Sequence, residues 1–117
     1  MSTNKPKILI VDDEPDILEL IEYNLKKEGY QVYTASNGQE AVQEARKTLP
    51  DLIILDIMMP KMDGIEACRI MRAMPEFKNT FMVFLTARSE EYSEIAGFNV
   101  GADDYIAKPI KPRALIS

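Results

Sequence analysis

The sequence has no histidine and only one cysteine, Cys68. Without histidine, the protein cannot use imidazole for acid–base catalysis or bind zinc through histidine ligands. A single cysteine excludes an intrachain disulfide and is typical of proteins from a reducing compartment. No apolar run approaches the roughly 20 residues of a membrane span, and residues 1–7 contain no signal-peptide core. We therefore expect a cytoplasmic protein with no membrane partner.

Charge and length narrow the class of protein further. The net charge of −5 argues against direct DNA binding by this domain, because DNA binding needs a basic surface. A chain of 117 residues is long enough for one hydrophobic core but not for two. The sequence contains no repeat, low-complexity segment or internal linker. We therefore predict a single domain over residues 1–117.

Strand and helix patterns alternate along the chain. Apolar runs predict five strands, at residues 7–11, 30–35, 52–55, 81–85 and 105–107. Amphipathic segments predict a helix after each of the first four strands, beginning near Pro15, Ala41, Ile65 and Ser89. Crossovers of this length join parallel strands, so the pattern predicts an α/β fold, a three-layer αβα sandwich around a five-stranded parallel sheet. Only residues 112–117 remain for a fifth helix, so we expect a truncated helix and a fragment of a longer protein with a C-terminal output domain.

Polar side chains follow four of the predicted strands where those strands end: Asp12, Asp13, Asp56, Thr86 and Lys108. The carboxyl ends of parallel strands meet at one edge of the sheet, so we expect these side chains to converge. Three crowded carboxylates repel one another, and a hard divalent cation such as Mg²⁺ relieves that repulsion and leaves room for a phosphate oxygen. A carboxylate such as Asp56 beside a metal ion and an ammonium group is a competent nucleophile for phosphoryl transfer.

Asp13 also has a purely structural interpretation. Either Asp13 or Glu14 can cap the first helix, because Pro15 favours the first helical position and Asp is a preferred N-cap residue. Capping alone, however, does not explain why Asp12 and Asp56 are expected at the same edge. We therefore favour metal binding for Asp13.

Four motifs, taken together, resemble one known family. ILIVDDE at residues 8–14, LIILDIMMPKMDG at 52–64, FLTA at 84–87 and the Lys108-Pro109 pair are similar to the receiver domain of two-component response regulators. The motifs occur in that family's order and spacing, and the resemblance extends over residues 5–113. It implies a flavodoxin-like, CheY-like fold with the strand order 2-1-3-4-5.

The resemblance implies a chemical role for each residue of the acidic edge. Asp56 would accept a phosphoryl group from the phosphohistidine of a sensor histidine kinase. Asp13 and Asp56 would ligate Mg²⁺ (or Mn²⁺) directly with the Met58 backbone carbonyl, whereas Asp12 would act through a bound water. Lys108 would pair with the phosphoryl oxygens.

The resemblance also implies a switch. Thr86 would hydrogen-bond the phosphoryl group, Tyr105 matches an aromatic switch position, and Pro109 would follow a cis peptide bond. Asp103 and Asp104 resemble acids that join salt bridges across a receiver dimer in the winged-helix class of regulators. That dimer would form through the fourth helix, the fifth strand and the fifth helix.

Two other functions fit the predicted fold less well. An aspartyl-nucleophile phosphohydrolase needs a second Asp two residues after the nucleophile, where this chain has Met58. A nucleotide- or flavin-binding module needs a Gly- or Ser/Thr-rich phosphate loop after the first strand, where Asp12 and Asp13 would repel phosphate. We therefore expect a phosphorylation switch and not an enzyme with turnover. Its output is expected to be transcription control, with DNA bound only by an output domain outside this chain.

Overall fold

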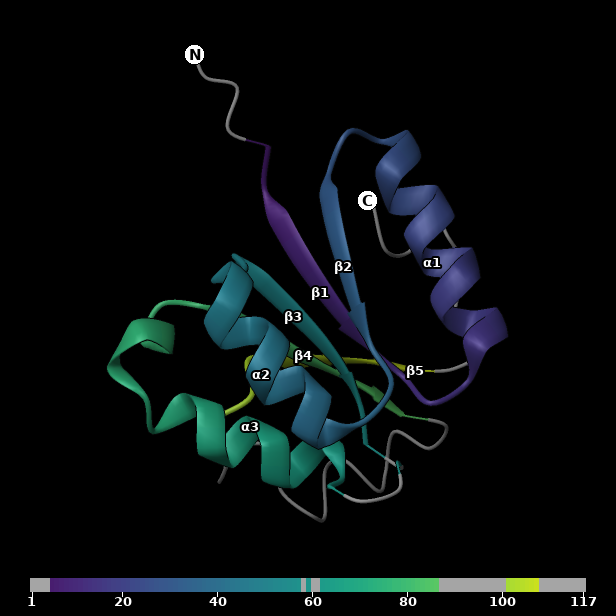
Figure 1. Cartoon of the computed structure of the whole chain (residues 1–117). Helices are drawn as coiled ribbons and strands as arrows, with labels where there is room; N and C mark the ends of the chain where they lie inside the picture. Colours follow the sequence, from purple (N-terminus) through teal and green to yellow (C-terminus); the bar gives the residue numbers. More distant parts are fainter. Residues whose placement is uncertain (1–4, 58, 60–61, 87–100, 108–117) are drawn as a thin grey trace.

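The computed structural model describes residues 5–57, 59, 62–86 and 101–107 (Figure 1). Five strands form one parallel sheet in the order β2-β1-β3-β4-β5. The strands are β1 Lys7–Val11, β2 Gln31–Ala35, β3 Leu52–Asp56, β4 Phe81–Thr86 and β5 Asp104–Ala107. The helices of the described residues are α1 Pro15–Lys27, α2 Gly38–Thr48, α3 Gly64–Arg72 and the short 3₁₀ helix η1 Pro75–Phe77. The predicted α/β class, parallel sheet and strand order are confirmed.

Helices cover both faces of the sheet, with α1 on one side and α2 and α3 on the other (Figure 1). Ile10 of β1 packs in one core cluster with Ile21 and Leu25 of α1. Its neighbours Leu9 and Val11 join the larger cluster beneath α2 and α3, because successive strand residues face opposite sides of a sheet. Burial on both faces explains why the central strands are continuous apolar runs in the sequence.

Side-chain caps fix the residues at which α2 and α3 begin, at the carboxyl edge of the sheet. The Asn37 side chain accepts a hydrogen bond from the Glu40 N–H at 2.9 Å, which satisfies a donor that the first turn of α2 leaves open. Asp63 caps α3 in the same way. Because of the Asn37 cap, α2 begins at Gly38 and not near Ala41, where the apolar pattern predicts it.

Two predicted helices lie outside the described residues. The helix expected after Ser89 falls in residues 87–100, and the truncated fifth helix falls in residues 108–117. In the part of the chain that the structure describes, no helix combines the length and the apolar content that a membrane crossing requires.

Candidate functional site

Three aspartates meet at the carboxyl edge of the sheet. Asp12 and Asp13 follow the last residue of β1, and Asp56 is the last residue of β3. Each offers one carboxylate oxygen, and these three oxygens lie within 4.8 Å of one another. Asp12 and Asp56 are buried, with 0% and 4% of their surface exposed, whereas Asp13 is exposed. The structure therefore brings together the three acids that the sequence places at this edge.

Backbone hydrogen bonds hold the Asp12 side of the cluster in place. The Asp12 N–H donates to the Ala35 carbonyl at 3.2 Å, and Asp12 Oδ1 accepts from the Glu14 N–H at 2.9 Å. Glu14 is the N-cap residue of α1, its side chain makes no capping hydrogen bond, and Pro15 is the first helical residue. Asp13 is therefore not the cap of α1, and its carboxylate remains a metal-ligand candidate.

The donor set of this cluster suits Mg²⁺. Mg²⁺ takes oxygen ligands at about 2.1 Å in an octahedron, so neighbouring and opposite ligand oxygens lie about 3 to 4 Å apart. Three carboxylate oxygens within 4.8 Å of one another come close to that spacing. Asp12, Asp13 and Asp56 are the residues that would hold the ion.

The segment after Asp56 is held by contacts that the sequence analysis did not predict. The Ile57 N–H donates to the Leu85 carbonyl at 3.1 Å, and the Gly64 N–H donates to the Ile57 carbonyl at 3.0 Å. A Cβ atom on Gly64 would lie 2.2 Å from the Asp56 carbonyl oxygen, so only glycine fits there. The sequence signal for this contact was a glycine at the first position of a helix, where helix propensity does not favour it.

Thr86 lies on β4, the neighbour of β3, and Tyr105 lies on β5, one strand further from the acidic cluster. Asp56 pairs with Leu85 of β4, and Thr86 follows as the last residue of that strand. The structure thus places the Thr86 backbone beside the cluster, but its side chain is outside what the structure describes. Tyr105 of β5 is half-buried and packs against the core cluster beneath α2 and α3.

Three further residues with predicted roles lie outside the described residues. They are the carbonyl ligand Met58, the phosphoryl partner Lys108 and the cis-peptide residue Pro109. Their roles stay predictions.

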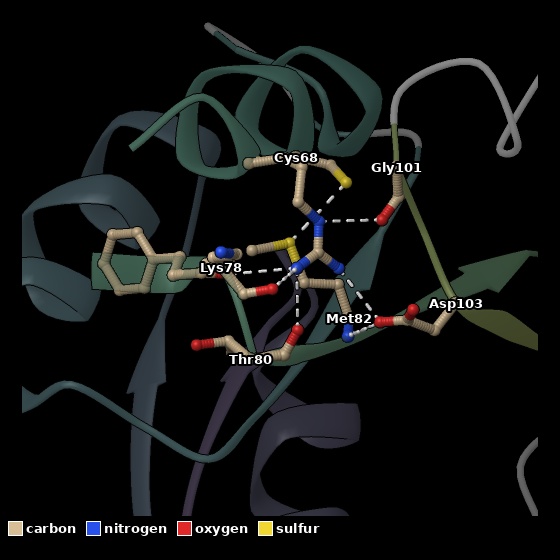
Figure 2. A network of polar contacts seen from close by, with 8 residues as sticks. Cys68, Lys78, Thr80, Met82, Gly101 and Asp103 are labelled. Atoms are coloured by element: carbon tan, nitrogen blue, oxygen red, sulfur yellow. Dashed lines mark hydrogen bonds and ion pairs between the residues drawn. The ribbon is translucent and has the colours of Figure 1, made fainter. Parts of the chain in front are cut away.

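The neighbouring acids Asp103 and Asp104 have different surroundings. Asp103 Oδ2 accepts hydrogen bonds from Arg72 Nη2 at 2.9 Å and from the Met82 N–H at 2.8 Å (Figure 2). Arg72, the last residue of α3, also donates to the carbonyl oxygens of Phe77, Thr80 and Gly101. Asp104 is exposed, and its Oδ1 accepts from the N–H of the next residue in β5. Asp103 therefore has partners within the chain, and dimer formation through either acid stays a prediction.

Cys68 of α3 lies in the core close to the Arg72 network. It is fully buried, and its Sγ donates to the Met82 sulfur at 3.7 Å. Burial raises the pKa of the Cys68 thiol from 9.0 to about 11, partly opposed by the nearby Arg72 guanidinium. The thiol is therefore a packing group.

Comparison with known proteins identifies relatives of the whole domain. The family model described as the response regulator receiver domain matches residues 8–117. The alkaline phosphatase synthesis transcriptional regulatory protein PhoP of Bacillus subtilis is 50% identical over 108 residues, which cover 92% of this chain. The chain spans 44% of the length of that relative.

Solved structures of related proteins have the same fold as this chain. The chemotaxis response regulator CheY4 of Vibrio cholerae superposes with a TM-score of 0.91 at 34% identity, covering 97% of this chain and 94% of CheY4. The receiver domain of the sensor histidine kinase PA1611 of Pseudomonas aeruginosa has a TM-score of 0.87 at 32% identity, covering 96% of this chain and 92% of that one. In the PA1611 structure a magnesium ion is coordinated in the active-site cleft.

Proposed function

This chain belongs to the response regulator receiver domain family, and from that premise we propose that Asp56 accepts a phosphoryl group from a sensor histidine kinase in a Mg²⁺-dependent reaction. The observation that best supports this proposal is that Asp12, Asp13 and Asp56 place carboxylate oxygens within 4.8 Å of one another. A magnesium site in the related PA1611 receiver domain supports the same assignment.

The chemistry of the proposed step follows from the carboxylate at the end of β3. An Asp56 oxygen attacks the phosphorus of the phosphohistidine, an O–P bond forms and the P–N bond breaks. The bond electrons stay on the imidazole nitrogen, which takes a proton from solvent. When bound, Mg²⁺ supplies positive charge that balances the phosphoryl oxygens, and Lys108 is proposed to do the same from the end of β5.

The protein's own contribution to this step is positioning. Asp12 is held through its backbone by Ala35, and Asp56 sits in the last position of a strand paired on both sides. With only 4% of its surface exposed, Asp56 is in an environment that strengthens electrostatic interactions and limits access of water to the acyl phosphate. A fixed, shielded carboxylate is suited to retaining a phosphoryl group.

We also propose that the domain is a switch and not a turnover enzyme. The position two residues after Asp56 is Met58, so the chain lacks the Asp that an aspartyl phosphohydrolase uses there as general acid. Phosphorylation adds a charge near −2 and strong acceptors, towards which the Thr86 hydroxyl would be drawn. Tyr105, half-buried on β5, is the neighbouring side chain that would respond, altering the surface around this strand.

The wider role rests on the PhoP relative. Because PhoP is a transcriptional regulatory protein, we infer that the protein containing this domain controls transcription, with a separate domain binding DNA. A homodimer through the β5 surface would be the means of control. Both acids are exposed, but Asp104 is better suited to that contact, because the Asp103 carboxylate already pairs with Arg72.

The proposal is tested by labelling with phosphoramidate, a small phosphodonor, followed by intact mass. The parent chain should gain one phosphoryl group in the presence of Mg²⁺ and none after chelation. Asp56→Asn should abolish labelling, whereas Asp51→Asn, at the exposed residue just before the same strand, should not. Labelling that survives in Asp56→Asn would refute the assignment. Release of many phosphates per protein from a generic phosphate ester would favour the hydrolase instead.

A further inference from the structure

The corner between β2 and α2, residues 35–38, contacts both sides of the acidic cluster. On one side the Ala35 carbonyl accepts the N–H of Asp12 at 3.2 Å. On the other side the Gly38 N–H donates to the Met62 carbonyl at 3.0 Å, in the segment that follows Asp56. One short piece of backbone therefore contacts Asp12, just after β1, and Met62, in the segment that follows β3.

Gly38 lies so close to Met62 that a side chain at position 38 would overlap it. A Cβ atom on Gly38 would lie 2.3 Å from the Met62 carbonyl oxygen, 2.7 Å from its Cβ and 2.8 Å from its Cγ. The closest of these atoms belongs to the backbone, so a side-chain rotation of Met62 cannot relieve the overlap. Gly38 is buried at the first position of α2, which the Asn37 cap holds in place.

A second close contact connects Met62 to the phosphoacceptor. Gly64 lies two residues after Met62 and packs its Cα against the peptide that joins Asp56 to Ile57. Its N–H donates to the Ile57 carbonyl at 3.0 Å. Movement of Met62 away from α2 would thus be transmitted through Gly64 to the backbone of Asp56.

We propose that Gly38 is a positioning residue for the acidic site, although it lies on a helix that contributes no ligand. Because Gly38 has no side chain, Met62 can pack against it, and the Gly38 N–H binds the Met62 carbonyl. Through Gly64, the position of Met62 then sets the distance of Asp56 from Asp12. This assignment rests on the proposed function, because it takes the aspartate cluster to be the Mg²⁺ site. Groups that orient metal ligands from outside the ligand set commonly change metal affinity by about 10- to 100-fold.

The test compares two glycine-to-alanine variants. Gly38→Ala should weaken Mg²⁺ binding, measured by titration calorimetry, by roughly tenfold, and should slow phosphoramidate labelling at limiting Mg²⁺. Gly29→Ala is the matched control, because Gly29 has φ +98°, so alanine is strained there, but nothing lies within 4 Å of its added Cβ. Gly29→Ala should lose stability and keep the Mg²⁺ affinity of the parent. Equal Mg²⁺ affinities for the two variants would overturn the proposal.

Amide hydrogen exchange on the parent chain gives a test that does not require Gly38→Ala to fold. The Gly38 N–H, bonded to Met62, should exchange several-fold more slowly when Mg²⁺ is added. The Gly29 N–H, bonded to the Lys26 carbonyl at 3.0 Å, should slow much less. Equal slowing at both amides would count against the proposal. A parent chain that is not labelled at Asp56 would refute the proposed function separately, while the Mg²⁺ titrations would still decide the role of Gly38.

Discussion

Arg72 and Asp103 form an ion pair of 2.9 Å between the end of α3 and the residue that precedes β5. The Asp103 oxygen that binds the guanidinium also accepts a hydrogen bond from the N–H of Met82 in β4. The pair therefore joins α3, β4 and the residue before β5. Gly101 has φ +94°, and a Cβ atom on it would lie 2.7 Å from Arg72 Cγ. Glycine at this position therefore lets the arginine pass close to the backbone.

Replacement of Arg72 should be costly. Arg72→Ala removes the arginine donor from the carbonyls of Phe77, Thr80 and Gly101 and from the Asp103 carboxylate, which keeps the Met82 N–H. We expect a loss of roughly 2 to 4 kcal/mol in unfolding free energy, measured by urea denaturation.

Arg69→Ala is the matched control for Arg72→Ala, since both changes replace arginine by alanine in α3. Within the described part of the chain, Arg69 pairs with Glu66 on the surface, and its side chain is 59% exposed. Its loss should cost less than about 1 kcal/mol. Similar losses for the two variants would show that the partly buried Arg72 network adds little to stability.

Mg²⁺ should stabilise the chain through the aspartate cluster. At a Mg²⁺ concentration 100 times Kd, the unfolding free energy should rise by about 2.7 kcal/mol, and chelation should remove the gain. Asp13→Asn should reduce this gain, and because Asp13 is exposed the change should disturb the core little. Asp16→Asn, an exposed acid in the first turn of α1 and outside the cluster, should keep the full gain. An equal Mg²⁺ response in all three proteins would contradict the site.

Much of the fold could be predicted because strands that are buried on both faces are continuous apolar runs in the sequence. The runs at 7–11, 52–55 and 81–85 became β1, β3 and β4 with small changes at their ends. The acidic cluster was predictable for a related reason, since Asp12 and Asp56 directly follow buried runs whose carboxyl ends share one edge. The strand order came from the family resemblance.

Contacts between distant residues were not predictable in this way. Arg72 looks like an ordinary charged residue at a helix end, and its role depends on Gly101 and Asp103, which lie 29 and 31 residues later. The contact of Gly38 with Met62 likewise exists only once α2 and the segment after β3 have packed together. Neither contact follows a periodic pattern, so no local pattern indicates it.

Leu49 should respond to substitution with a gain of stability. It ends α2 with φ 51° and ψ 64°, in the left-handed region that is unfavourable for leucine, and 52% of its surface is exposed. Asparagine tolerates this conformation better, so Leu49→Asn should add roughly 0.5 to 1 kcal/mol to the unfolding free energy. Lys47→Asn, in the last turn of the helix, should lower it by a few tenths of a kcal/mol, because asparagine is a weaker helix former than lysine. A loss of stability in Leu49→Asn, measured by urea denaturation, would contradict the argument.

Cys68 should make the stability of the chain depend on pH under alkaline conditions. In the folded protein burial raises the pKa of this thiol from 9.0 to about 11, so the folded state retains a proton that the unfolded chain loses near pH 9. The corresponding stabilisation is complete below the unfolded pKa and is lost as the pH rises through the folded pKa. Since one pKa unit corresponds to about 1.4 kcal/mol, the loss should be roughly 2 to 3 kcal/mol between pH 9 and pH 11.

Cys68→Ala separates this effect from the titration of other groups. Any other group that titrates in this range is present in both proteins, so its contribution cancels in the difference. At about pH 8 the parent should be the more stable protein, because alanine leaves a small cavity beside Met82. As the pH rises to about 11, the difference in unfolding free energy between the parent and Cys68→Ala should shrink by the roughly 2 to 3 kcal/mol that the thiol contributes. A constant difference over this range would mean that the buried thiol ionises in the folded protein as readily as in the unfolded chain.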